Sequence, residues 1–280
     1  MANLDNTIEW EGIMDKPTVG FIGLGEMGRP MAQRLLEHGH SVTSCAHQRR
    51  ENIEALKAHG LIEAATAHDA ALGADVVITM VRDTAESKAV IEQERGVLDA
   101  MKEGATLIIM STVDPGFCQR LATEASTRNI AVIDAPVSGF YFRAVEGTLA
   151  IMTGGDEVAI EAQRPLLETL GTIHLCGGPG MGQVAKLSNN TVALGVLSLL
   201  REARAFARDH GMAEDDLMRI LQNASADGFL VRNWDAVAPV WNNVMELAVK
   251  DVGTCLAAAK ARNHEMPVAQ AMFERIVNGD

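Results

Sequence analysis

The chain has 280 residues, of which 48% are hydrophobic and 22% are charged, as in a globular protein that buries a core. Its formal net charge is −13 and no basic stripe stands out, so we expect neither nucleic acid nor a membrane surface as a partner. No apolar run reaches the length that spans a membrane. An anionic ligand would therefore need a local positive site.

The cysteines and histidines predict neither a disulfide framework nor a metal site. The four cysteines are far apart and form no CxxC pair, and the eight histidines form no HExxH motif. A reducing compartment, the cytoplasm, is the expected location. Residues 1–16 contain acids throughout and lack an apolar core, so we interpret them as an N-terminal extension and not as a signal peptide.

Residues 18–36 read as a strand, a glycine turn and a helix. The apolar run 18–22 is followed by glycines at three spaced positions, and a helical pattern continues from there. This arrangement places a pyrophosphate at a helix N-terminus, although glycines also mark ordinary turns. Gly23 would permit the turn, Gly25 would let the phosphates approach the backbone, and Gly28 would let the helix pack on the strand. The cofactor-binding candidates here are Gly23, Leu24, Gly25, Glu26, Met27 and Gly28.

Strand and helix patterns then alternate up to residue 175. The expected strands are 41–45, 75–81, 106–110, 130–133, 149–153 and 172–175. The expected helices are 49–59, 84–92, 115–128 and 157–169. This alternation predicts an α/β fold with a doubly wound, Rossmann-type parallel sheet.

The character changes at the glycine-rich joint 177–182, after which helical patterns alone remain. They cover residues 183–210, 214–223, 243–262 and 268–277. We therefore expect a dinucleotide-binding domain at 17–179 and an all-helical substrate and dimerisation domain at 180–280. The helix expected at 183–210 is apolar round much of its circumference between residues 192 and 200. That pattern favours a homodimer or higher homo-oligomer, the alternative being an internal core helix.

Lys186 lies one turn into this long helix, in a segment otherwise rich in valine, alanine and leucine. Asn190 is four residues further on, so the two side chains share a face, and Gln183 borders it. A cation near a helix N-terminus is electrostatically unfavourable, which favours loss of its proton and acid–base chemistry. The alternative is an ordinary surface lysine.

A third segment follows the expected strand 130–133 at its carboxyl end, where open α/β sheets bind ligands. It reads DAPVSGFYFRAVEGTL. Ser138 and Gly139 offer a hydroxyl and backbone N–H groups suited to a carboxylate. Pro136 and the Ser-Gly pair would equally form a β-turn.

Four motifs in order make the chain similar to the β-hydroxyacid dehydrogenase family, which includes 3-hydroxyisobutyrate dehydrogenases and tartronate semialdehyde reductases. They are FIGLGEMGRPMA, DAPVSG with a following GTL, GMGQVAKLSNN, and the Lys-Asp pair in ELAVKDVGTCLAAA. The motifs extend over residues 18 to 260, and their combination is far more specific than any one of them.

The resemblance implies roles for the substrate side of the site. Lys186 matches the family's catalytic lysine, which gives a proton to the carbonyl oxygen in reduction and takes the hydroxyl proton in oxidation. Asn190 matches an asparagine that positions the substrate, and Ser138 and Gly139 match the carboxylate-binding loop. A small carboxylate-bearing substrate is implied.

Further positions match the family's contacts with a nicotinamide cofactor. Lys250 corresponds to a lysine near the nicotinamide, and Thr112 to a threonine that contacts the cofactor. Val81 and Arg82 replace a usual Leu-Pro pair. The implied chemistry is hydride transfer, in which the protein supplies alignment and proton transfer.

The end of the second expected strand bears on the choice of cofactor. NAD selection needs an acid there, but no acid occurs before Glu51. His47, Gln48 and Arg49, with Arg50, could instead bind a 2′-phosphate. We therefore expect NADP, with NAD the less favoured alternative, although these arginines could simply begin the next helix facing water.

Two other functions remain open, namely an imine reductase-like enzyme and a non-catalytic dinucleotide-binding module. Relatives of both kinds generally lack the catalytic lysine, so the presence of Lys186 disfavours them. The family also has glycine where this chain has Phe140, followed by Tyr141 and Phe142. These aromatics could shape an unusual substrate pocket, or Phe140 could cover a subunit contact.

Overall fold

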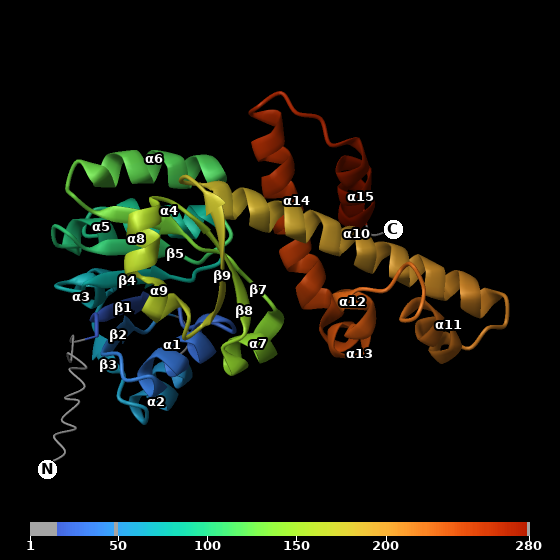
Figure 1. The fold of residues 1–280 in the computed structure, drawn as a ribbon, viewed down its shortest axis with the longest axis horizontal. Helices are drawn as coiled ribbons and strands as arrows, with labels where there is room; N and C mark the ends of the chain where they lie inside the picture. The colour runs from blue at the N-terminus through green and yellow to red at the C-terminus, as the bar shows by residue number, and fades with distance from the viewer. Residues whose placement is uncertain (1–15, 48–49, 279–280) are drawn as a thin grey trace, which may run out of the picture.

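The computed structural model describes residues 16–47 and 50–278, which form a mixed sheet followed by a helical part (Figure 1). The strands are β1 (Val19–Ile22), β2 (Val42–Cys45), β3 (Ile62–Ala64), β4 (Val76–Thr79), β5 (Thr106–Ile109), β6 (Ala131–Asp134), β7 (Val137–Ser138), β8 (Leu149–Gly154) and β9 (Gly171–Gly177).

The strand order confirms the predicted Rossmann-type sheet. It runs β3-β2-β1-β4-β5-β6-β8-β7, with β9 also paired to β8. Strands β1 to β6 are parallel, whereas β8 runs antiparallel to β6 and β7. The order reverses between β1 and β4, and the crevice beyond the carboxyl ends of these two strands is where such sheets bind ligands.

Helices cover both faces of the sheet (Figure 1). They are α1 (Gly28–Glu37), α2 (Glu51–Lys57), α3 (Ala67–Ala71), α4 (Thr84–Glu92), α5 (Val97–Ala100), α6 (Pro115–Ser126), α7 (Phe140–Glu146), α8 (Glu157–Ala162) and α9 (Arg164–Leu167). Alternate residues of the buried strands enter opposite cores. Ile108 belongs to the cluster with α1, whereas Leu107 and Ile109 belong to the cluster with α6.

The helical part begins directly after β9, as predicted. It comprises α10 (Met181–Asp209), α11 (Glu214–Leu221), α12 (Phe229–Arg232), α13 (Trp234–Val237), the short 3₁₀ helix η1 (Ala238–Val240), α14 (Trp241–Lys260) and α15 (Pro267–Asn278). Helix α10 starts beside the sheet and extends well beyond it, and α14 crosses it (Figure 1). None of the helices among the described residues has the length and apolarity to cross a membrane.

Several short elements depart from the sequence prediction. Strand β3 and helices α3 and α5 were not expected, and the segment expected as a loop after β6 contains α7. The predicted helix 157–169 is two helices, because the chain leaves helical geometry at Gln163, two residues before Pro165. Elements this short carry little hydrophobic periodicity, and tertiary packing decides whether they form.

Candidate active site

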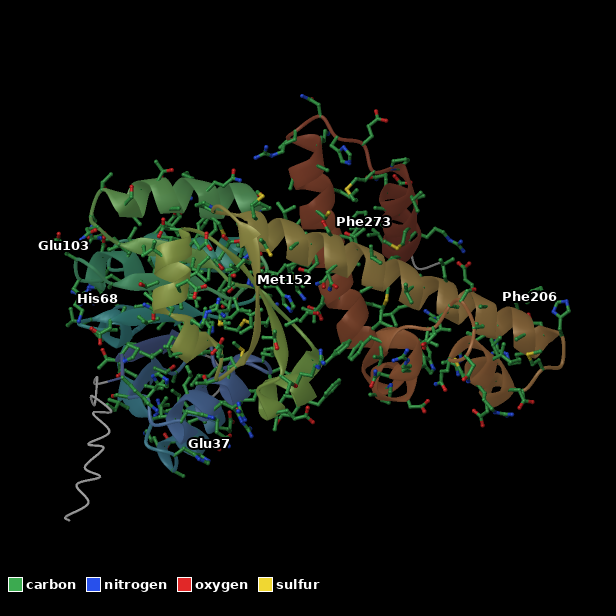
Figure 2. All side chains as sticks on the ribbon, in the orientation of Figure 1. Glu37, His68, Glu103, Met152, Phe206 and Phe273 are labelled. Atoms are coloured by element: carbon green, nitrogen blue, oxygen red, sulfur yellow. The ribbon has the colours of Figure 1, made fainter. Side chains whose placement is uncertain are left out.

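A cavity of about 1800 Å³ lies between the carboxyl edge of the sheet and helices α10, α12 and α14. Of the predicted site residues that the structure describes, all but Arg50 line it: Gly23, Leu24, Gly25, Glu26, Met27, Gly28, His47, Val81, Arg82, Thr112, Ser138, Gly139, Lys186, Asn190 and Lys250. Gln48 and Arg49 lie outside the described residues. In Figure 2, Met152, another lining residue, marks the place where the sheet meets α10.

The three glycines of the β1–α1 loop differ in what surrounds them. Gly23 has φ +103°, and a Cβ there would lie 2.2 Å from the carbonyl oxygen of Met80. A Cβ at Gly28 would lie 1.9 Å from the carbonyl oxygen of Gly23. A Cβ at Gly25 would meet nothing within 4 Å. Gly23 and Gly28 therefore serve the fold of the turn, whereas Gly25 leaves an open backbone surface toward the cavity.

The carboxyl end of β2 presents no acid to the cavity. Cys45, Ala46 and His47 line it there. The Arg50 guanidinium is turned to protein carboxylates, at 3.1 Å from Glu54 and 2.9 Å from Glu63. In this structure the charge of Arg50 is paired within the protein, so a contact with a 2′-phosphate, which stays a prediction, would require Arg50 to exchange these exposed ion pairs.

Lys186 is buried at the cavity, with 8% of its surface exposed. Burial lowers the pKa of its ammonium group to about 8, a shift that the Asp251 carboxylate opposes and Lys250 reinforces. The direction agrees with the sequence argument from the helix N-terminus, but desolvation is the largest cause. Among the described residues no hydrogen bond or ion pair engages the Lys186 Nζ atom, so it remains available to a ligand.

Asp251 organises the side chains around this lysine, and the sequence analysis missed it. Its Oδ2 atom accepts a 2.6 Å hydrogen bond from Asn190 Nδ2, and its Oδ1 atom lies 2.9 Å from Lys250 Nζ. The carboxylate thus fixes the amide of Asn190, four residues from Lys186 on α10. The available signal was the Lys-Asp pair, of which only the lysine was assigned a role.

Lys250 joins the helical part to two loops of the sheet. Its Nζ atom donates to the carbonyl oxygens of Arg82, at 2.9 Å, and Thr112, at 3.3 Å. These residues follow β4, which borders the crevice, and its neighbour β5. Lys250 therefore holds α14 against the loops expected to contact the cofactor.

The start of α10 is anchored by a buried carboxylate at the end of β6, a second group that the sequence analysis missed. Asp134 accepts hydrogen bonds from the backbone N–H groups of Gly180, at 2.7 Å, and Gln183, at 2.9 Å. Burial raises the pKa of Asp134 to about 6, against the opposing effect of these backbone donors. The carboxylate caps the N-terminus of the helix that carries Lys186.

Gln183 completes this anchor and does not line the cavity. Its fully buried side chain accepts from the N–H of Val113 and donates to the carbonyl oxygen of Ser111, both at 2.9 Å. The first turn of α10 is thereby tied to the end of β5, which restricts where Lys186 can lie.

The segment after β7 keeps a glycine-like backbone although it carries a phenylalanine. Gly139 has φ +141° and Phe140 has φ +62°, the left-handed region that costs a side-chain-bearing residue about 1–3 kcal/mol. The Phe140 ring lines the cavity and packs on the core of the helical part, 6.4 Å from the ring of Phe229. This placement within its own chain favours a pocket-shaping role. The backbone at Ser138 and Gly139 still faces the cavity.

Two family models match the chain, one on each side of the glycine-rich joint. Residues 18–178 match the NAD binding domain of 6-phosphogluconate dehydrogenase. Residues 180–278 match the NAD-binding domain of NADP-dependent 3-hydroxyisobutyrate dehydrogenase.

Individual relatives match over nearly the whole chain. The chain is 34% identical over 256 residues to 2-hydroxy-3-oxopropionate reductase of Escherichia coli, covering 89% of this chain and 86% of the reductase. It is 32% identical over 262 residues to NAD-dependent L-serine dehydrogenase of Pseudomonas aeruginosa, with coverage of 89% and 88%. The solved structure of Mycobacterium tuberculosis 3-hydroxyisobutyrate dehydrogenase with L-serine superposes with a TM-score of 0.80 at 28% identity, covering 94% and 93% of the two chains.

Proposed function

The chain belongs to the β-hydroxyacid dehydrogenase family of NAD(P)-dependent oxidoreductases, and we propose that it is an NADP-dependent dehydrogenase of a small β-hydroxy acid, or a reductase of the corresponding semialdehyde. One observation carries this proposal. Lys186, buried and with its ammonium group unengaged among the described residues, lines the same cavity as the glycine loop and the loop at Ser138.

Residues of this chain would hold the cofactor along the carboxyl edge of the sheet. The open backbone at Gly25 suits a pyrophosphate. Val81, Arg82 and Thr112 line the cavity beyond it, and Lys250 fixes the last two. The absence of an acid at residues 45–47, together with the imidazole of His47 and the positive charge of Arg49 nearby in the sequence, supports NADP over NAD.

When bound, the nicotinamide supplies the hydride in reduction and accepts it in oxidation. Lys186 acts as the general acid toward the carbonyl oxygen and as the general base toward the hydroxyl. Its pKa of about 8 leaves both protonation states populated near neutral pH. Asn190, fixed by Asp251, orients the oxygen, and Ser138 with Gly139 binds the carboxylate.

Consumption of NADPH and NADH with a panel of short 3-oxo acids and aldehydes tests the proposal. We expect turnover of at least one carbonyl acid, with kcat/KM at least about 10-fold higher for NADPH, since about 1.4 kcal/mol from one phosphate contact gives that ratio. An equal or reversed ratio would overturn the choice of NADP. Tight NADPH binding without turnover of any carbonyl would favour a non-catalytic module.

We also propose that residues 180–280 form a homodimer through α10. Three of its apolar side chains lie at seven-residue spacing and are about two-thirds exposed, Val192 at 67%, Leu199 at 66% and Phe206 at 66%. Residues seven apart share one helix face. Figure 2 shows Phe206 near the end of α10 remote from the sheet. An apolar stripe of this kind on a single chain fits a second copy of the chain.

Leu199→Glu is expected to convert the dimer to a monomer, because it places a charge in the centre of the apolar stripe. Light scattering after size-exclusion chromatography measures the mass directly. Val158→Glu, at a 78% exposed valine on α8, is the matched control and should leave the mass unchanged. A wild-type chain that is monomeric at micromolar concentration would rule out this interface.

A cytoplasmic location remains our proposal. All four cysteines are unpaired: Cys45, Cys118, Cys176 and Cys255. Free thiols in this number support a reducing compartment.

A further inference from the structure

We propose that Arg143 determines substrate specificity by binding a second anionic group of the substrate, separate from the carboxylate assigned to Ser138 and Gly139. The substrate class is then a dianion, a carbonyl acid with a second carboxylate or comparable oxyanion. The inference rests on the proposed function, because it concerns the substrate of the same cavity.

The stem of Arg143 lies against the substrate loop. A Cβ placed on Gly139 would lie 2.6 Å from Arg143 Cδ and 2.9 Å from Arg143 Cβ. The side chain therefore folds back from α7 over the loop. Arg143 lines the cavity together with Ser138 and Gly139. The absence of a side chain at Gly139 is what allows this approach.

The guanidinium group of Arg143 is held by a ring and not by an acid. Its Cζ atom lies 5.4 Å from the centroid of the Phe229 ring. Within the part of the chain that the structure describes, no carboxylate forms an ion pair with Arg143. Asp227, close to Phe229 in the chain, is instead paired with Arg232, whose Nε atom donates to it at 2.8 Å. Stacking on an aromatic face leaves the planar N–H edge free for bidentate binding of an oxyanion.

Arg143 and Lys186 line the same cavity but have different neighbours. The rings of Phe140 and Phe229, 6.4 Å apart, both line the cavity and form an aromatic wall at this end of it. Phe142 packs 6.0 Å from Phe140 without lining the cavity. The charged groups that act electrostatically on Lys186 are instead Asp251 and Lys250. A substrate could thus place its carbonyl at Lys186, its carbon chain along the wall and its second anion at Arg143.

Arg143→Gln tests this assignment, because it keeps a side chain of similar shape and removes the charge. We compare kcat/KM with NADPH for 3-oxohexanedioate, which has two carboxylates, and 3-oxohexanoate, which has one. The wild type should prefer the diacid by at least about 10-fold, as expected for a charge-assisted hydrogen bond. In the variant the diacid should lose about 10- to 100-fold and the monoacid less than about 3-fold.

Arg120→Gln is the matched control, because Arg120 also stacks on a ring, 5.5 Å from that of Phe117, but does not line the cavity. Arg120→Gln should leave kcat/KM unchanged for both the diacid and the monoacid. Equal losses on both substrates in Arg143→Gln, or a wild-type preference for the monoacid, would overturn the inference.

Binding of unreactive acids keeps the test independent of turnover. Calorimetric titration of the NADPH complex should show tighter binding of hexanedioate than of hexanoate, and Arg143→Gln should abolish that difference. Equal affinities of the two acids for the wild type would contradict the inference. Failure of the proposed function would appear differently, as a lack of turnover with the whole carbonyl panel.

Discussion

Lys186→Ala is expected to lower kcat for carbonyl reduction by about 10²- to 10⁴-fold, the range typical of losing a general acid. The Kd for NADPH should stay within about twofold, because the proposed role places the lysine at the reacting oxygen and not at the phosphates. Steady-state kinetics and a fluorescence titration measure the two quantities. An equal loss of cofactor affinity and rate would show that Lys186 holds the cofactor instead.

The role proposed for Lys186 also predicts opposite pH dependences for reduction and oxidation. In the proposed mechanism reduction requires protonated Lys186, so kcat/KM for the carbonyl substrate should be level below the pKa of about 8 and fall above it. Oxidation requires the neutral amine, so its rate should rise through the same pH and level off above it. Lys186→Ala should remove this inflection in both directions. Lys186→Arg keeps the positive charge but cannot release its proton, so it should not recover the oxidation rate.

Gly25→Val should weaken NADPH binding by about 100-fold or more while leaving the melting temperature nearly unchanged. The position is open, with nothing within 4 Å of a Cβ placed there, so the fold has room for the valine. The proposed pyrophosphate contact requires that same space. A fluorescence titration and thermal unfolding of the same preparation measure the two effects.

Gly28→Val is the matched comparison, and its main effect should be on the stability of the fold. Its Cβ would fall 1.9 Å from the Gly23 carbonyl oxygen, so we expect a loss of about 3 kcal/mol or more in the free energy of unfolding. Unchanged NADPH affinity in Gly25→Val would refute the assignment of this loop to the cofactor.

The long and strongly patterned elements could be predicted from sequence because local pattern and tertiary role coincide there. β1, β4 and β5 are apolar runs that are buried on both faces, as parallel strands are. The apolar periodicity of α10 extends over most of its length. By contrast, β3 has only three residues, and α7 begins at a phenylalanine in a left-handed conformation. No local sequence pattern therefore predicts either element.

In the candidate site, too, only those features that depend on local spacing could be predicted from the sequence. The shared face of Lys186 and Asn190 follows from helical spacing alone, so it could be read locally. The roles of Asp251 and Asp134 depend on hydrogen bonds across 61 and 46 residues of chain, which no local pattern reveals. The ion pair between Arg50 and Glu63 could not be predicted for a related reason, since Glu63 lies on the unpredicted strand β3.

Chemical rescue of Lys186→Ala is the most direct test of proton transfer at this position. Small primary amines such as methylamine would be added to the variant with saturating NADPH and a carbonyl acid that the wild type reduces. The rate should rise with amine concentration, and more strongly for amines small enough to enter the vacated space. A variant that binds NADPH normally but gains no rate from any amine would contradict a proton-donating role for Lys186.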